Sequence, residues 1–186
     1  MKKLTQKDFI KKISQISNSG ISVFNCCELK NVIEGKGMDE LDFDVYLPTK
    51  NKNLQRNLVW TLEQKRQLIW SILKDMHIPK LTVITRRRWK GNNVNLVQVI
   101  DGKQRVNAVM SFIKKEFALI HNGNEYFIDD LDEILLGQIM SYSFKADEYY
   151  EYPDDLFTDE EKIYLFEFVN FFGTPQDIEH LNNLKK

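Results

Sequence analysis

The sequence predicts an α+β protein that has a small mixed sheet with surrounding helices. Segments in which every second residue is apolar alternate irregularly with segments whose apolar residues recur every three or four positions. Two pairs of expected strands are separated by residues typical of hairpin turns. The chain has 186 residues, of which 42% are hydrophobic, and this suffices for the core of one domain.

Helices are expected over residues 5–17, 61–76, 103–113, 131–140 and 158–171. Two of them begin with a capping box, which pairs Thr61 with Gln64 and Thr158 with Glu161. The helix over 61–76 must end before Pro79, because a residue that precedes proline is disfavoured in the helical region.

Strands are expected over residues 41–47, 81–86, 94–100, 117–120, 126–128 and 141–144. The alternation over 41–47 indicates a half-buried strand. The turn at 91–93 joins one strand pair, and the turn at 121–124 contains Asn-Gly, a strong hairpin signal. Residues 21–37 show no clear pattern beyond a turn at 35–37.

The charges are divided between the two parts of the chain. Residues 1–115 carry 22 Lys and Arg against 10 Asp and Glu, whereas residues 116–186 carry 4 against 17. The basic part suggests phosphate or nucleic acid as a partner. The acidic part could shield that surface, imitate phosphate or neutralise the fold internally, and its segment 147–161 is expected to be solvated.

Several classes of protein are disfavoured. No apolar run is long enough to span a membrane, and no apolar stretch follows the first lysines, so we expect a cytoplasmic protein with no membrane partner. Cys26 and Cys27 are the only cysteines and are adjacent, which suits neither a disulfide framework nor a metal-binding Cys-x-x-Cys.

The strongest candidate site is Asp101-Gly102-Lys103-Gln104-Arg105, at a predicted strand-to-helix junction. Gly102 permits a tight turn and close approach of a ligand. The N–H groups of the first helical turn attract anions, and the planar fork of Arg105 can hold a phosphate by two bonds. Asp101 could bind a metal ion or accept a proton. The alternative is an ordinary turn followed by an exposed helix start.

A second candidate is the hairpin sequence Arg86, Arg87, Arg88, Trp89 and Lys90. Its four cations could contact a DNA backbone, and Trp89 could stack on an unpaired base. The alternative is that the charges protect an edge strand from aggregation and that Trp89 folds back onto the sheet.

Four segments of the chain carry a resemblance to a known family. They are LQRNLVWTLEQKRQLIWSIL (54–73), HIP (77–79), VIDGKQRVNAVMSF (99–112) and FVNFFGTPQDIEH (168–180). In this order they resemble the DGQQR-motif domain of unknown function in the GmrS half of GmrSD-type modification-dependent restriction systems. The resemblance covers roughly residues 40–183. It implies a ParB/sulfiredoxin-like fold and the binding or hydrolysis of a nucleoside triphosphate, linked to restriction, modification sensing or phage defence.

The resemblance also assigns site residues. The DGQQR positions are residues 101–105, and two further family positions fall on Gln55-Arg56 and on Asn170. Lys103 replaces the first Gln of the motif, and Phe168 stands where many members have Arg. We expect residues 1–40 to form an N-terminal helix and a connecting segment, and residues 41–186 to form the domain, with no His-Asn-His nuclease of its own.

The leading hypothesis is therefore a phosphate-handling enzyme domain that binds a nucleoside triphosphate with Mg²⁺ and acts as a hydrolase or phosphotransfer module. Lys103 and Arg105 would neutralise phosphate, Arg56 would approach from the facing loop, and Asp101 would position metal or water. Expected partners are a nucleotide, DNA and a nuclease or other defence-system protein. One alternative is a non-catalytic DNA-binding or regulatory protein of the same fold, and another is an acidic decoy that binds a partner protein through residues 129–161.

Overall fold

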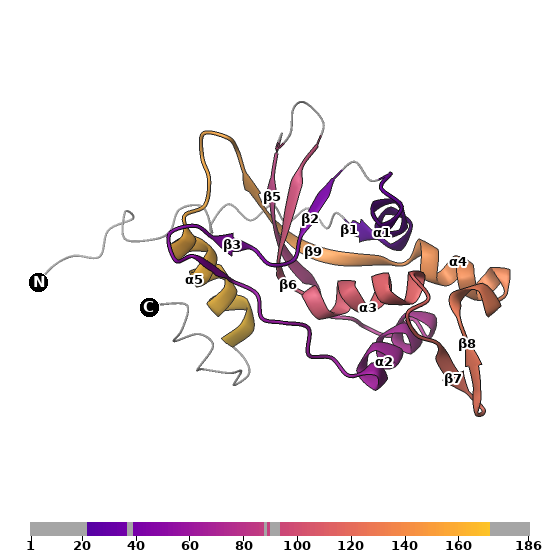
Figure 1. The fold of residues 1–186 in the computed structure, drawn as a ribbon. Helices are drawn as coiled ribbons and strands as arrows, with labels where there is room; N and C mark the ends of the chain where they lie inside the picture. Colours follow the sequence, from indigo (N-terminus) through magenta and orange to yellow (C-terminus); the bar gives the residue numbers. More distant parts are fainter. Residues whose placement is uncertain (1–21, 37–38, 88, 90–93, 172–186) are drawn as a thin grey trace, which may run out of the picture.

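A five-stranded mixed sheet is the centre of the molecule (Figure 1). The computed structural model describes residues 22–36, 39–87, 89 and 94–171. The elements are β1 (Ser22–Asn25), α1 (Cys26–Ile33), β2 (Glu40–Asp42), β3 (Tyr46–Leu47), β4 (Lys52–Asn53), α2 (Leu62–Leu73), β5 (Leu81–Arg86), β6 (Leu96–Asp101), α3 (Lys103–Ile113), β7 (Leu119–His121), β8 (Asn124–Tyr126), the 3₁₀ helix η2 (Ile128–Asp130), α4 (Glu133–Ser141), β9 (Ser143–Glu151) and α5 (Asp159–Phe171).

The strand order in the main sheet is β1-β9-β5-β6-β2. The central strand β5 runs antiparallel to β6 and parallel to β9, while β2 is parallel to β6 and β1 is antiparallel to β9. β3 with β4 and β7 with β8 form two small separate sheets. The predicted α+β class with a mixed sheet is thus confirmed, and the likeness to ParB and sulfiredoxin stays a prediction.

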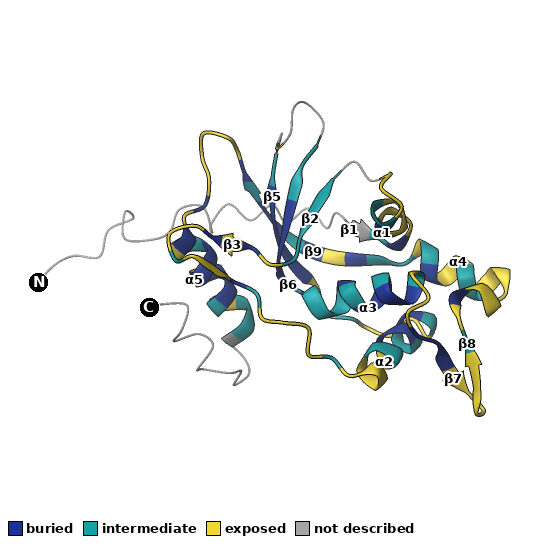
Figure 2. Ribbon diagram, in the orientation of Figure 1, coloured by how far each residue is buried: buried dark blue, intermediate teal, exposed yellow. Residues whose placement is uncertain are grey.

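Helices cover both faces of the main sheet, which gives the molecule two cores (Figure 2). In the larger core, Val83 and Val99 pack with residues of the four helices α1, α2, α3 and α4. In the smaller core, Ile84 and Ile100 pack with residues of α5. Successive side chains of a strand point to opposite faces. A strand covered on both faces is therefore buried at successive positions, as β5 is from residue 81 to residue 85, where two of the five residues are threonines.

Several predicted elements are confirmed. β5 has its predicted bounds, α3 begins at Lys103, and both capping boxes form. The β7–β8 hairpin turns at Asn122 and Gly123, whose φ values of 50° and 79° are those of a primed two-residue turn. The predicted helix over 5–17 lies outside the described residues.

The predicted strand over 41–47 is wrong, because a turn divides it into β2 and β3. Asp42 Oδ1 accepts the N–H groups of Asp44 at 3.0 Å and Val45 at 2.8 Å. Val45 has a φ of 52°, which is a genuine outlier for a β-branched residue. A short polar side chain that bonds its own backbone has overridden the period of two.

Residues 21–37, which showed no clear pattern, contain β1 and α1. Asn25 caps α1, and Glu28 completes a capping box. This signal was present in the sequence and was missed. Since Cys26 and Leu29 belong to the larger core, α1 packs with the rest of the fold. The domain boundary near residue 40 stays a prediction.

The acidic segment 147–161 is not a solvated surface segment throughout. β9 continues to Glu151, and both Glu148 and Glu151 are buried. Acidic β9 lies beside β5, so Lys80 pairs with Asp147 at 3.0 Å and Arg86 with Glu151 at 2.7 Å. Here the acidic part of the chain neutralises the basic part within the fold. The described helices include none that is long and apolar enough to cross a membrane.

Candidate functional site

The turn from β6 into α3 leaves a helix start without a cap. Gly102 precedes α3 with a φ of 106°, and no side chain caps the helix. The N–H of Val106 makes the first intrahelical bond, to the Gly102 carbonyl. The N–H groups of residues 103–105 therefore have no acceptor in the described part of the chain, and they carry the positive end of the helix dipole.

Two features of this turn favour glycine: the positive φ at residue 102, and the close approach of Leu81. A β-carbon at position 102 would lie 2.2 Å from Leu81 Cδ2. Leu81 is fully buried, so its side chain cannot swing into solvent. The backbone of the turn is thus held directly against the sheet, and the side chains around it form a hollow.

A cavity of about 200 Å³ opens at this turn. Its walls come from the loop before α2, from residues 101–105 and from α5. The lining residues are Gln55, Arg56, Trp60, Asp101, Gly102, Lys103, Gln104, Arg105, Phe166 and Asn170. All eight residues that the sequence assigned to a phosphate or nucleotide site are among them. The sequence reasoning missed Trp60 and Phe166, although Phe166 lies one helical turn before Asn170.

The Arg105 guanidinium is engaged by the protein itself. One of its nitrogens donates to Asp101 Oδ2 at 2.6 Å, and another donates to the carbonyls of Pro79 and Lys80. The Arg105 side chain is only 12% exposed. The Arg105 guanidinium, which was expected to bind phosphate, is therefore already hydrogen-bonded to groups of the protein. Its bond to Asp101 orients that carboxylate. The other carboxylate oxygen of Asp101 has no hydrogen bond in the described part of the chain.

The two glutamine side chains build the walls of the cavity. Gln104 Oε1 accepts the N–H groups of Val59 and Trp60 at 3.2 Å each, and its amide donates to the Asn57 carbonyl. Gln55 Nε2 donates to the carbonyls at the end of β6, residues 99 and 100. These bonds hold the loop before α2 against α3 and β6.

The remaining predicted residues make the cavity positive. Arg56 is exposed on the loop, and Lys103 Nζ pairs with Asp44 at 2.7 Å. Asn170 donates from its amide to the Phe166 carbonyl at 2.9 Å, one helical turn back. Three cations and one carboxylate, Asp101, line the walls, and Asp44 pairs with Lys103 beside them. The excess of one positive charge favours an anion.

Metal binding at this site depends on Asp101 alone. The described residues contain no group of three or more His, Cys, Asp or Glu that could hold a metal ion. Mg²⁺ is usually held by one or two carboxylates together with substrate phosphates and water. The open oxygen of Asp101 fits that pattern only when a phosphate ligand supplies the other oxygens.

The arginine-rich hairpin lies apart from the residues that line this cavity. Arg86 pairs with Glu151 and stacks over Trp89, with its guanidinium 4.9 Å from the ring centroid, and Arg87 lies 4.5 Å from the ring centroid of Tyr150. The Trp89 indole donates to Glu40 at 3.3 Å and is 39% exposed. Arg88 and Lys90 lie outside the described residues. The two described arginines thus serve contacts within the protein.

The fold and the site together define an α+β domain in which a strand-to-helix turn of sequence DGKQR is enclosed by the loop before α2 and by α5. Residues 38–184 match the family model described as GmrSD restriction endonuclease, N-terminal domain. The chain belongs to this family, as the motifs indicated, and the family links it to restriction and phage defence. No curated protein and no solved structure gives a significant match to the chain.

Proposed function

We propose that the cavity at the start of α3 binds the phosphates of a nucleoside triphosphate with Mg²⁺, and that hydrolysis there serves DNA restriction. One observation carries this proposal. Residues from three separate segments, 55–56, 101–105 and 170, line a single cavity at an uncapped helix start. Such a helix start is a ready-made site for phosphate.

The charges around the cavity support the binding of a polyphosphate. The N–H groups at the start of α3 and the exposed side chain of Arg56 belong to residues that line the cavity. Lys103 also lines the cavity, with its ammonium paired to Asp44. A hydrogen bond to a charged group contributes about 1.5–3 kcal/mol, so the loss of one such contact should weaken binding about tenfold or more.

Asp101 is the residue that would hold Mg²⁺ or orient water. Bound Mg²⁺ would neutralise charge on the phosphate oxygens. The Arg105 guanidinium keeps the Asp101 carboxylate in position through the 2.6 Å bond, and this makes Arg105 a positioning residue rather than a phosphate ligand. The DNA-cleaving step belongs to a nuclease partner in this proposal.

The test is a titration of the full chain with ATP, GTP, CTP or UTP, with and without Mg²⁺, followed by an assay for released phosphate. Arg56→Ala is expected to weaken nucleotide binding by about tenfold or more. Lys114→Ala is the matched control, because Lys114 is an exposed cation at the opposite end of α3. Equal affinity of Arg56→Ala and wild type would contradict the proposed site.

A second candidate is a non-catalytic module that binds DNA or regulates a defence partner. It is favoured by the single carboxylate in the cavity, since hydrolases commonly employ more than one acid or base. DNA binding that falls steeply with salt, without phosphate release from any triphosphate, would select this candidate.

A further inference from the structure

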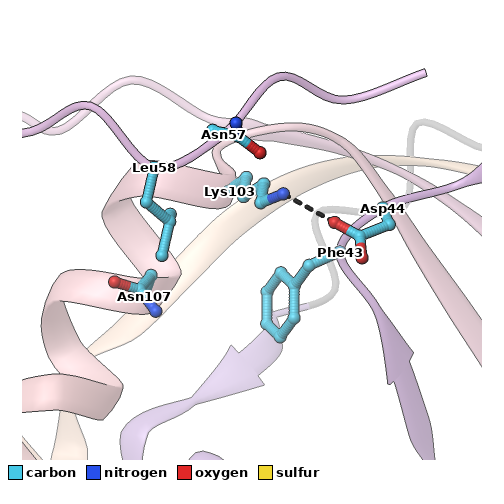
Figure 3. Close-up of a pocket in the computed structure, with 6 residues that line it drawn as sticks. All are labelled: Phe43, Asp44, Asn57, Leu58, Lys103 and Asn107. Atoms are coloured by element: carbon cyan, nitrogen blue, oxygen red, sulfur yellow. Dashed lines mark hydrogen bonds and ion pairs between the residues drawn. The ribbon is translucent and has the colours of Figure 1, made fainter. Parts of the chain in front are cut away.

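A second hollow adjoins the cavity at the start of α3 (Figure 3). It has a volume of about 330 Å³ and is lined by Phe43, Asp44, Asn57, Leu58, Lys103 and Asn107. Lys103 also lines the first cavity and is therefore common to the walls of both. The volume lies at the lower end of the range for small-molecule sites.

Apolar side chains form two opposite walls of this hollow. The Phe43 ring lies across it from Leu58 and Asn107 (Figure 3). Leu58 is 48% exposed, although it is a large apolar side chain, and Phe43 is half-buried against the larger core. An aromatic ring and an aliphatic side chain that face each other across a gap offer surfaces for a flat heterocycle, which they would remove from water.

Two amide side chains supply polar groups. Neither Asn57 nor Asn107 has a hydrogen-bond partner for its side chain among the described residues. Asn107 lies four residues after Lys103, so both project from the same face of α3. The Asn57 backbone is fixed by the bond from Gln104 to its carbonyl. A carboxamide donates and accepts at once, and this suits the hydrogen-bonding edge of a nucleobase.

The segment that carries Phe43 is held in an unusual conformation. It precedes Val45, whose φ of 52° is sustained by the bonds from the backbone to Asp42. Asp42 in turn accepts the buried Gln98 amide at 3.0 Å. The Gln55 N–H donates to the Asp44 carbonyl, which ties the same turn to the loop of the first cavity. Backbone strain of this kind concentrates at ligand sites.

We propose that this hollow binds the nucleobase of the nucleoside triphosphate whose phosphates bind at the start of α3. This inference rests on the proposed function and goes beyond it, because it assigns base recognition to Phe43, Leu58, Asn57 and Asn107. Lys103 would then lie between the base and the phosphates of the bound nucleotide.

The experiment compares each nucleoside triphosphate with inorganic tripolyphosphate, which has the phosphates and no base, by calorimetry with Mg²⁺ on the full chain. Wild type is expected to bind at least one nucleotide about tenfold more tightly than tripolyphosphate, a difference that one base hydrogen bond with stacking can supply. Asn107→Ala and Leu58→Ala are expected to remove most of that preference and to leave tripolyphosphate affinity unchanged. Unchanged tripolyphosphate affinity also shows that the variants are folded.

Asn31→Ala is the matched control, because Asn31 is an exposed asparagine on α1. It should retain the preference for nucleotide. Equal affinity of wild type for nucleotides and tripolyphosphate would overturn the base site while the phosphate site stands. The base site would also be overturned if Asn107→Ala and Leu58→Ala both kept the preference for nucleotide over tripolyphosphate. If neither ligand binds to wild type, the proposed function fails as well.

Discussion

Substitution of Gly102 by alanine is the most direct test of how the site is built. The φ of 106° at this position is costly for any residue with a β-carbon, by about 1–3 kcal/mol. The new β-carbon would also lie 2.2 Å from Leu81 Cδ2. Overpacking of a core typically costs about 1–3 kcal/mol. Gly102→Ala is therefore expected to lower the free energy of unfolding by about 2–6 kcal/mol.

Two other glycines separate the two causes. Gly123 has a φ of 79° and no atom within 4 Å of a built β-carbon, so Gly123→Ala tests backbone strain alone. Gly137, in the interior of α4, likewise has nothing within 4 Å. Gly137→Ala is expected to stabilise the fold by about 0.5–1 kcal/mol, because alanine loses less entropy in a helix.

The assay is urea denaturation at 25 °C, followed by the fluorescence of the three tryptophans. The difference between Gly102→Ala and Gly123→Ala measures the contact with Leu81. If Gly102→Ala loses no more stability than Gly123→Ala, then Leu81 yields to the new β-carbon. In that case the close packing of the turn on the sheet does not constrain the cavity, and the reasoning is refuted.

Three further predictions concern buried and loop contacts. Glu151→Gln should lower the free energy of unfolding by about 3–5 kcal/mol in the same denaturation assay, because it removes the charge that pairs with the buried Lys162 and the partly buried Arg86; a loss below 1 kcal/mol would contradict this. Burial raises the pKa of Cys26 from 9.0 to about 12, with a smaller contribution from Cys27, so only the unfolded thiol ionises between these values. The free energy of unfolding should fall between pH 9 and pH 12 by up to about 1.4 kcal/mol per pH unit, a dependence that Cys26→Ala should lack. Gln104→Ala should accelerate hydrogen exchange at the two loop N–H groups that its side chain accepts, and unchanged protection there would show that other contacts hold the loop.

Local signals in the sequence predicted the elements that they control. The box of Thr61 with Gln64 begins α2, and Asn-Gly makes the turn between β7 and β8. The same kind of signal at Asn25 was overlooked, so that miss was avoidable.

Other features depend on residues far apart in the chain. The burial of Glu151 follows from the position of β9 beside β5, and no spacing within the acidic segment indicates it. Gln55 and Asn170 were assigned to the site only through the resemblance, because their own neighbours carry no signal for a ligand. Trp60 and Phe166 were missed for the same reason.

The sequence by itself determined the α+β class, the position of the turn at Gly102 and the family to which the chain belongs. These follow from hydrogen bonds and periodicities within a few residues, and from motifs that can be read in order. Only the tertiary structure decided that three separate segments of the chain line one cavity, that the fork of Arg105 serves Asp101, and that a second hollow lies beside Lys103. Such features arise when strands and helices from distant parts of the chain pack together, and the energy of those contacts has no local signature.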